Sequence, residues 1–281
     1  MELNVQTFIS CDSKYEDANV VLFGAPFDST TSYRPGARFA SSAIRSESFG
    51  IETYSPYLRG DITDYKIFDA GDLDLPFGNA GRVLDTIESF CGKVHDDDKM
   101  PVMIGGEHLV TFGAVRAAAA RYPDLAILHF DAHADLRRDY MGEFLSHATV
   151  MRRVWDIVGD GRIYQFGIRS GSREEFEWAM DHVRMEQFNA NSIDSCAEAV
   201  VSHPVYITVD LDVIDPAEFP GTGTPEAGGM SFRALHDALT SLRGLDVIGF
   251  DLCELSPHYD ASGASTALAC KLLREMLIAF S

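Results

Sequence analysis

Residues 125–135 read LAILHFDAHAD. The opening run is apolar apart from one histidine, which is typical of a strand buried on both faces of a parallel sheet. Four polar residues follow on every second position: His129, Asp131, His133 and Asp135. Alternate residues of an extended chain point to one side, so the segment crowds two carboxylates and two imidazoles together. Such crowding is unfavourable unless a positive group lies among the carboxylates.

Seven other short apolar runs indicate strands like this one, and amphipathic stretches separate them. The eight expected strands are Val20–Phe23, Lys66–Asp69, Pro101–Ile104, Leu125–Phe130, Ile163–Phe166, Val183–Gln187, Val205–Asp210 and Val247–Leu252. The expected helices include Gly81–His95, Leu109–Arg121, Ser172–Met180, Ser192–Val201, Ser231–Leu242 and Ala264–Phe280. Apolar strands joined by crossover helices predict an α/β fold with a mainly parallel eight-stranded sheet covered on both faces.

The chain has no low-complexity linker, repeat or break in composition, so we expect one domain over residues 1–281. A barrel of eight βα units is the alternative, because the period of the pattern does not exclude it. No segment resembles a signal peptide or a membrane-spanning helix. The five cysteines are scattered and never form a CxxC pair, which favours reduced thiols and a cytoplasmic protein.

The formal net charge is −20, from 23 Lys and Arg against 43 Asp and Glu. This balance makes nucleic acid and anionic membranes poor candidate partners. It is compatible with a small cationic substrate.

Three further polar clusters follow expected strands. GGEH occupies residues 105–108, VDLDVIDP occupies 209–216, and CELSP occupies 253–257. Because parallel strands end at one edge of a sheet, these clusters and residues 131–135 are expected to meet there. One acidic strand end is often only a solvated edge or a helix cap. Four clusters at the same edge indicate a functional site.

The expected ligand set contains four carboxylates and two imidazoles. It consists of His108, Asp131, His133, Asp135, Asp210 and Asp212. Two metal ions bridged by shared carboxylates use this set better than one ion does. Oxygen-rich ligands without thiolates favour Mn²⁺ over Zn²⁺. A metal pair that activates water favours a hydrolytic reaction.

At this level of detail the chain resembles the ureohydrolases, the Mn²⁺-dependent arginase and agmatinase family, and looks like its agmatinase-type branch. The resemblance covers most of the chain. It rests on GAPFDSTTSYRPGARFASSAIR, DAGDLDL, GGEH, HFDAHADLR, LSHATVMRR, VDLDVIDPAEFPGTGTPEAGG and FDLCELSP, in this order. It implies a three-layer α/β/α sandwich, which counts against the barrel, and a homo-oligomer, either a trimer or a hexamer.

The resemblance also implies two Mn²⁺ ions per subunit. By motif, His108 would bind the first ion, and His133 and Asp212 would bind the second. Asp131 and Asp210 would bridge the two ions.

Three residues are expected to be catalytic by the same resemblance. Asp135 matches a ligand of the first ion that also hydrogen-bonds the bridging hydroxide. His147 matches a substrate-binding histidine proposed to carry a proton to the leaving amine, and Glu254 matches the carboxylate that pairs with the substrate guanidinium. His129 matches no family ligand, so we expect a partly buried structural histidine bonded to backbone.

The tail of the substrate is less well determined. Arginases carry an Asn and Ser pattern that binds the α-carboxylate, whereas the segment LRRDYMGEFLS lacks it. Agmatine, cleaved to putrescine and urea, is therefore the first expectation. Arg137 or Arg138 in the cleft would favour a carboxylate tail, so guanidinobutyrate ranks second and arginine third.

Three other classes remain open from the residues alone. A metal-dependent deacetylase would use one zinc, although both the HxD and the DxD motifs are present here. A two-metal phosphoesterase is compatible with the ligand set, but few basic residues accompany it. A non-catalytic protein of the same fold is expected to lack a ligand.

Overall fold

The computed structural model describes residues 6–281 and is built around one eight-stranded sheet. Every neighbouring pair in this sheet is parallel, and the strand order is β4-β1-β5-β10-β9-β6-β7-β8. The strands are β1 (Val20–Gly24), β4 (Ile67–Asp72), β5 (Met100–Ile104), β6 (Ala126–Phe130), β7 (Ile163–Ile168), β8 (Arg184–Gln187), β9 (Pro204–Asp210) and β10 (Asp246–Cys253). All eight expected strands are present; each begins and ends within two residues of its expected bounds, except that β4 extends three residues beyond its expected end.

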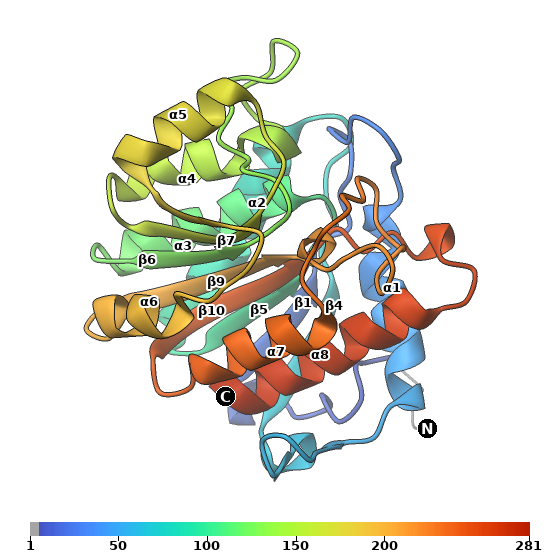
Figure 1. Cartoon of the computed structure of the whole chain (residues 1–281). Helices are drawn as coiled ribbons and strands as arrows, with labels where there is room; N and C mark the ends of the chain where they lie inside the picture. The colour runs from blue at the N-terminus through green and yellow to red at the C-terminus, as the bar shows by residue number, and fades with distance from the viewer. Residues whose placement is uncertain (1–5) are drawn as a thin grey trace.

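Helices cover both faces of the sheet (Figure 1). One layer contains α2 (Ala80–Asp96), α3 (Thr111–Arg121), α4 (Val150–Val158) and α5 (Arg173–His182). The other contains α1 (Ala40–Glu47), α6 (Ile193–Val200), α7 (Phe232–Ser241) and α8 (Ala264–Phe280). The expected three-layer α/β/α sandwich is confirmed, and the barrel is excluded because the sheet is open, with β4 and β8 at its edges.

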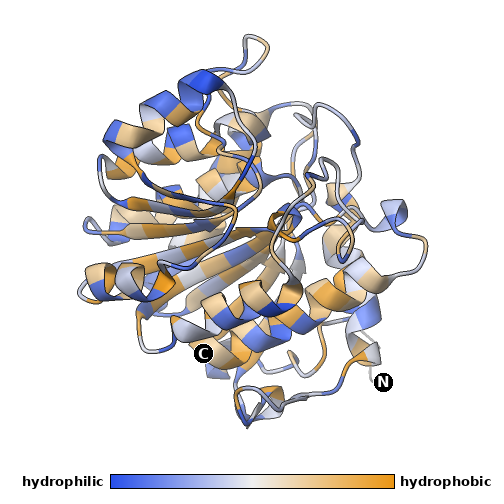
Figure 2. Ribbon diagram, in the orientation of Figure 1, coloured by the Kyte–Doolittle hydropathy of each residue, from blue (hydrophilic) through white to orange (hydrophobic). Residues whose placement is uncertain are grey.

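Alternation along each strand divides the core into two clusters. Ile127 on β6 packs with the layer that contains α2 to α5, whereas its neighbour Leu128 packs with the opposite layer. Both side chains are fully buried. A strand apolar on both faces therefore needs helices on both sides, and Figure 2 shows hydrophobic strands beneath helices with mixed faces.

The last helix, α8, has the expected bounds, and its apolar stripe packs on the sheet. Leu272 and Met276 are buried, while Leu268 and Phe280 are partly buried against the same cluster. Helices α1 and α4 were not among the expected helices. Helix α1 (ASSAIRSE) contains one large apolar residue, Ile44, which leaves little apolar period to detect, whereas α4 (VMRRVWDIV) carries an amphipathic pattern that was not selected.

Small elements complete the chain. A two-stranded antiparallel sheet pairs β2 (Tyr54–Ser55) with β3 (Gly60–Asp61). The 3-10 helices are Tyr15–Asp17, Ala37–Phe39, Ser48–Gly50, Ile62–Asp64, His108–Val110, His147–Thr149, Leu211–Val213 and Pro257–Tyr259. Within residues 6–281, none of the helices combines the length and apolarity that crossing a bilayer requires.

His95 near the end of α2 couples the stability of the fold to pH. It is 2% exposed and packs edge-on against Tyr122. Burial, assisted by the charge of Arg121, lowers the pKa of His95 to about 4. An unfolded histidine titrates near pH 6.5. Between about pH 6.5 and 4 the unfolded chain therefore binds the proton more readily, and the folded state loses stability as the pH falls.

We predict that His95→Phe removes this contribution, which amounts to roughly 3 kcal/mol across the window. The free energy of unfolding, measured by urea titration at pH 7 and pH 4, should fall less for the variant than for the wild type. His258→Gln is the matched control at an exposed site. A difference between His95→Phe and wild type that stays constant with pH would contradict the assignment.

Candidate metal centre and cleft

Four adjacent strands bring the polar clusters together. In the order β5-β10-β9-β6, each strand runs into one of the clusters at its carboxyl end. The clusters are separated by up to about 150 residues along the chain but follow strands that are neighbours in the sheet. The expected site edge of an open parallel sheet is thus occupied by the expected residues.

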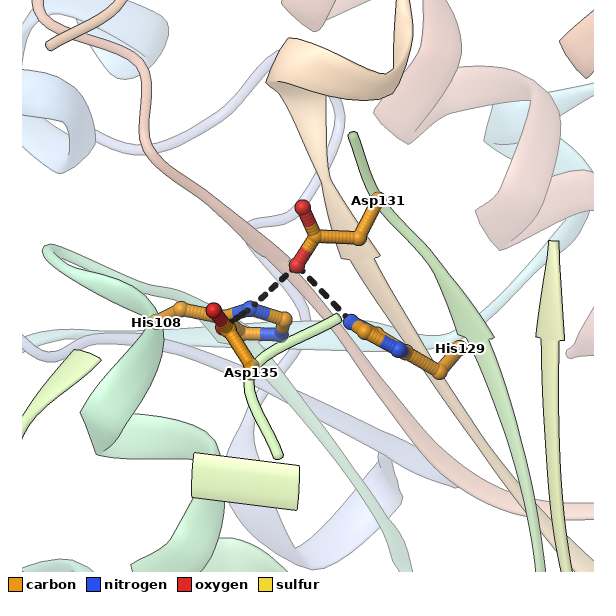
Figure 3. Close-up of side chains that lie close together, drawn as sticks. All are labelled: His108, His129, Asp131 and Asp135. Atoms are coloured by element: carbon orange, nitrogen blue, oxygen red, sulfur yellow. Dashed lines mark hydrogen bonds and ion pairs between the residues drawn. The ribbon is translucent and has the colours of Figure 1, made fainter. Parts of the chain in front are cut away.

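The first group of potential ligands surrounds His108. Its Nδ1 lies 3.0 Å from Oδ2 of Asp131 and 3.1 Å from Oδ2 of Asp135. Oδ2 of Asp210 lies 3.6 Å from the same nitrogen. Figure 3 shows His108, Asp131 and Asp135 converging, with His129 on the other side of the Asp131 carboxylate.

A second group surrounds His133. Its Nδ1 lies 3.0 Å from Oδ2 of Asp212 and 3.5 Å from Oδ1 of Asp131. Asp131 therefore belongs to both groups, and each group has the compactness that a metal ion needs. The Asp212 carboxylate also accepts hydrogen bonds from Ala132 N and Thr224 Oγ1. Shared use of one carboxylate is the arrangement that a bridged metal pair requires.

The pKa values of the buried carboxylates indicate that the site needs positive charge among them. Burial and the charges of Asp212 and Asp131 raise the pKa of Asp210 well above its usual range. Burial and the charge of Asp131 raise the pKa of Asp135 to about 7. Burial opposes ionisation of Asp131 as well, but hydrogen bonds from three surrounding histidines hold its pKa well below its usual range. Divalent cations would relieve this repulsion.

The backbone at two of these residues adopts a conformation that non-glycine residues seldom take. Asp135 has φ 54° and Glu254 has φ 66°. Both are in the left-handed region, where a Cβ atom is crowded by the backbone. Such conformations persist where the surrounding structure holds them, and they occur often at functional sites. They turn the two carboxylates toward the cavity that both residues line.

Three polar residues that the sequence analysis did not select orient His108. Its Nε2 lies 2.8 Å from Thr208 Oγ1, and Thr208 donates in turn to Asp251. Tyr206 also donates to Asp251, at 2.8 Å. The contact at Nε2 leaves Nδ1 to face the carboxylates, as an outer partner of a metal-binding histidine does. The sequence did contain a signal for these residues, because polar side chains inside an apolar strand need buried hydrogen-bond partners.

His129 differs from its prediction. It is fully buried, and Nε2 lies 2.8 Å from Oδ2 of Asp131 while Nδ1 lies 2.9 Å from Nε2 of Gln165. The expected bond to backbone is wrong, because both ring nitrogens contact side chains. His129 also lies within the compact group around His108. Its position behind the Asp131 carboxylate suits it to orient that carboxylate.

A cavity of about 190 Å³ leads from this centre to the surface. His147 and Glu254 line it, together with His108, His133, Asp135 and Asp210. The structure thus brings every expected catalytic residue to one cavity. Asp131 and Asp212 lie behind it, at less than 1% side-chain exposure. The size of the cavity suits a small molecule.

The sequence left open whether Arg137 or Arg138 lies in the cleft, and the structure shows their positions. Arg137 lines the cavity, 3.4 Å from Oε2 of Glu175 and over the ring of Tyr140. Arg138 is exposed. One guanidinium and one carboxylate, those of Arg137 and Glu175, therefore line the cavity together.

The fold and the site define an α/β protein with a candidate two-metal centre at the edge of its sheet. Comparisons with known proteins identify the family to which it belongs. The Arginase family model matches residues 18–279. The agmatinase of Bacillus cereus is 48% identical over 97% of this chain and 96% of its own length. The agmatinase of Bacillus subtilis is 45% identical over 98% and 96%. The agmatine ureohydrolase of Thermoplasma volcanium superposes with a TM-score of 0.90 at 38% identity, over 99% of this chain and 95% of that one.

The chain belongs to the arginase family. The prediction of a ureohydrolase of the agmatinase-type branch is confirmed, as is that of a hydrolase that acts on guanidino compounds. A non-catalytic protein is disfavoured by the intact site.

We predict that Asp131→Asn weakens metal binding at both positions, because its carboxylate belongs to both groups. Mn²⁺ at a hundred times its Kd should stabilise the wild type by roughly 3 kcal/mol. The variant should lose most of this gain and bind less than one ion per chain, measured by thermal unfolding and elemental analysis. Asp139→Asn, at an exposed position of the same segment, is the control. Two retained ions in Asp131→Asn would show that it is not shared.

Proposed function

We propose that this protein hydrolyses agmatine to putrescine and urea, with two Mn²⁺ ions per subunit. The observation that carries the proposal is the sharing of Asp131 between two ligand groups beside a cavity that Glu254 and His147 line. The curated relatives named agmatinase support the choice of substrate.

The ligand groups suggest how the ions would be held. His108 and Asp135 would bind one ion, His133 and Asp212 would bind the other, and Asp131 would bridge. Asp210, whose carboxylate also accepts a hydrogen bond from the amide of Asp212, is proposed as the second bridge. The donors are oxygen and imidazole nitrogen without thiolate, which fits Mn²⁺. When bound, such a pair supplies activation of water at neutral pH.

The protein's own residues would bind and orient the substrate. Glu254 is 6% exposed, and Oε1 accepts a hydrogen bond from the amide of His108 at 2.9 Å. Its carboxylate is thereby held beside the metal ligands, where it can pair with a planar guanidinium. Asp135, on the cavity wall, would hold a proton of the attacking water. Burial lowers the pKa of His147 to about 4, so its ring is neutral before the reaction and would first take up a proton from water and then pass it to the leaving amine.

A second candidate substrate class is ω-guanidino acids such as 4-guanidinobutyrate. The observation that favours it is Arg137 on the cavity wall. A guanidinobutyrase of Pseudomonas aeruginosa is 32% identical over 96% of this chain. Glu175 offsets the charge of Arg137, which reduces its repulsion of an ammonium tail. We therefore place agmatine first.

Urea release is the direct test of the substrate. The wild type should release urea from agmatine in the presence of Mn²⁺, more slowly from 4-guanidinobutyrate and more slowly still from arginine. Arg137→Gln should lower kcat/KM for 4-guanidinobutyrate more than for agmatine, because only the acid carries a tail carboxylate. Failure to release urea from any of the three with Mn²⁺ bound would overturn the proposed function.

Glu254→Gln tests the binding of the guanidinium separately. The amide keeps the shape of the side chain but loses the charge, so kcat/KM for agmatine should fall about a hundredfold. Metal content should be unchanged. Glu143→Gln, on an exposed loop, is the matched control. An equal effect of both variants would contradict the role of Glu254.

We further propose one domain over residues 1–281, a homo-oligomer, either a trimer or a hexamer, and a cytoplasmic location. The location is supported by five cysteines that are all free and buried.

A further inference from the structure

The segment after β1, residues 28–36, forms a loop beside the cavity and is anchored at both ends. We call it the cover loop. Asp28 is buried and accepts a hydrogen bond from Gly36 N at 2.7 Å, which closes the loop on itself. Arg34 donates to the backbone oxygen of Thr222 at 2.8 Å. Both ends of the cover loop are therefore held in place.

Glu107 ties the middle of the cover loop to the metal-ligand segment. It is fully buried and immediately precedes His108. Its carboxylate accepts hydrogen bonds from Thr30 N at 2.8 Å, Thr30 Oγ1 at 2.5 Å and Thr31 Oγ1 at 3.3 Å. Both carboxylate oxygens are used for this anchoring, so Glu107 is occupied as a structural link.

Two hydroxyl residues of the cover loop contact His147. The amide of His147 donates to Thr30 Oγ1 at 3.0 Å, and Nε2 lies 3.2 Å from Ser32 Oγ. On the other side of the ring, Nδ1 lies 3.3 Å from Ser146 Oγ. The edge-on ring of Tyr140 adds a further contact, with centroids 5.7 Å apart. The backbone and both ring nitrogens of His147 are thus restrained.

A hydroxyl is well suited to hold a histidine that exchanges a proton. It can donate to a neutral ring nitrogen and accept from a protonated one, because it carries both a hydrogen and lone pairs. Ser32 can therefore hold the ring of His147 in one orientation in both protonation states. Burial, assisted by the imidazoles of His133 and His108, lowers the pKa of His147 to about 4, and the carboxylate of Asp131 opposes the shift.

We propose that Thr30 and Ser32 are positioning residues for His147: Thr30 fixes its backbone against Glu107, and Ser32 fixes the orientation of its ring at the cavity wall. This inference rests on the proposed function, since it assigns how the proton donor of that reaction is held. Neither residue is proposed to bind metal or to form a bond with the substrate.

The test compares Ser32→Val with Ser32→Thr, which are equal in size and differ in the hydroxyl. Ser32→Val should lower kcat for agmatine roughly tenfold and leave KM within about twofold, because orientation of the proton donor is lost while the guanidinium site remains. Ser32→Thr should retain most of the activity. Ser29→Ala removes a hydroxyl from an exposed position on the same loop and is the control.

Double variants separate positioning of His147 from a general effect on the loop. In a His147→Ala background, Ser32→Val should cause no further loss of kcat, because the residue it positions is absent. Bound metal should be equal in all variants. A normal kcat for Ser32→Val, or the same fold-loss with and without His147, would overturn the inference.

A measurement without turnover completes the test. The ring ¹⁵N resonance that His147→Ala removes should shift in metal-free Ser32→Val and stay near its wild-type position in Ser32→Thr. An unchanged resonance in Ser32→Val would also overturn the inference. Absence of urea release by the wild type, in contrast, would refute the proposed function, and the resonance would still report on the contact.

Discussion

Asp131 accepts contacts from imidazoles on both sides, and the buried carboxylates around it repel one another. The parallel sheet forces this crowding, because four adjacent strands deliver their polar ends to the same edge. Water is largely excluded from these groups, so their repulsion is weakly screened. The rest of the site can be understood as what makes such a concentration of charge tolerable and useful.

Rigid surroundings convert this charge into a site with defined geometry. The chain from His108 through Thr208 to Asp251 runs into the centre of the sheet, where all three side chains are almost completely buried. Glu254 and Asp135 keep left-handed backbone conformations that a flexible segment would not hold. The result is a cavity whose inner end is set by the strands and whose outer end is formed by loops.

Strands and site were predictable to different extents. Most of the eight strands were predictable because they are apolar runs, although the edge strand β8 is mostly polar. The metal-ligand candidates were predictable because they follow such runs. Helix α1 was missed because it contains a single large apolar residue, Ile44, whereas the amphipathic pattern of α4 was present but was not selected. The contacts of His129 were missed because the alternation of residues along a strand predicts which face of the sheet a side chain lies on, but not which side chains it contacts. Thr30 and Ser32 have no local pattern that distinguishes them from other loop residues.

The sequence by itself determined an α/β fold with a parallel sheet, the edge at which the site lies, and six residues with metal-binding chemistry, while the choice of sandwich over barrel came from the resemblance. These follow from local rules: apolar period, strand direction and the donor atoms of each side chain. The shared role of Asp131 was expected from the resemblance, and the structure places its carboxylate in both groups. Only the tertiary structure decided that Asp251 supports His108 through Thr208 and that the cover loop reaches His147. Contacts between residues far apart in the chain depend on packing, and packing has no signature in a single sequence.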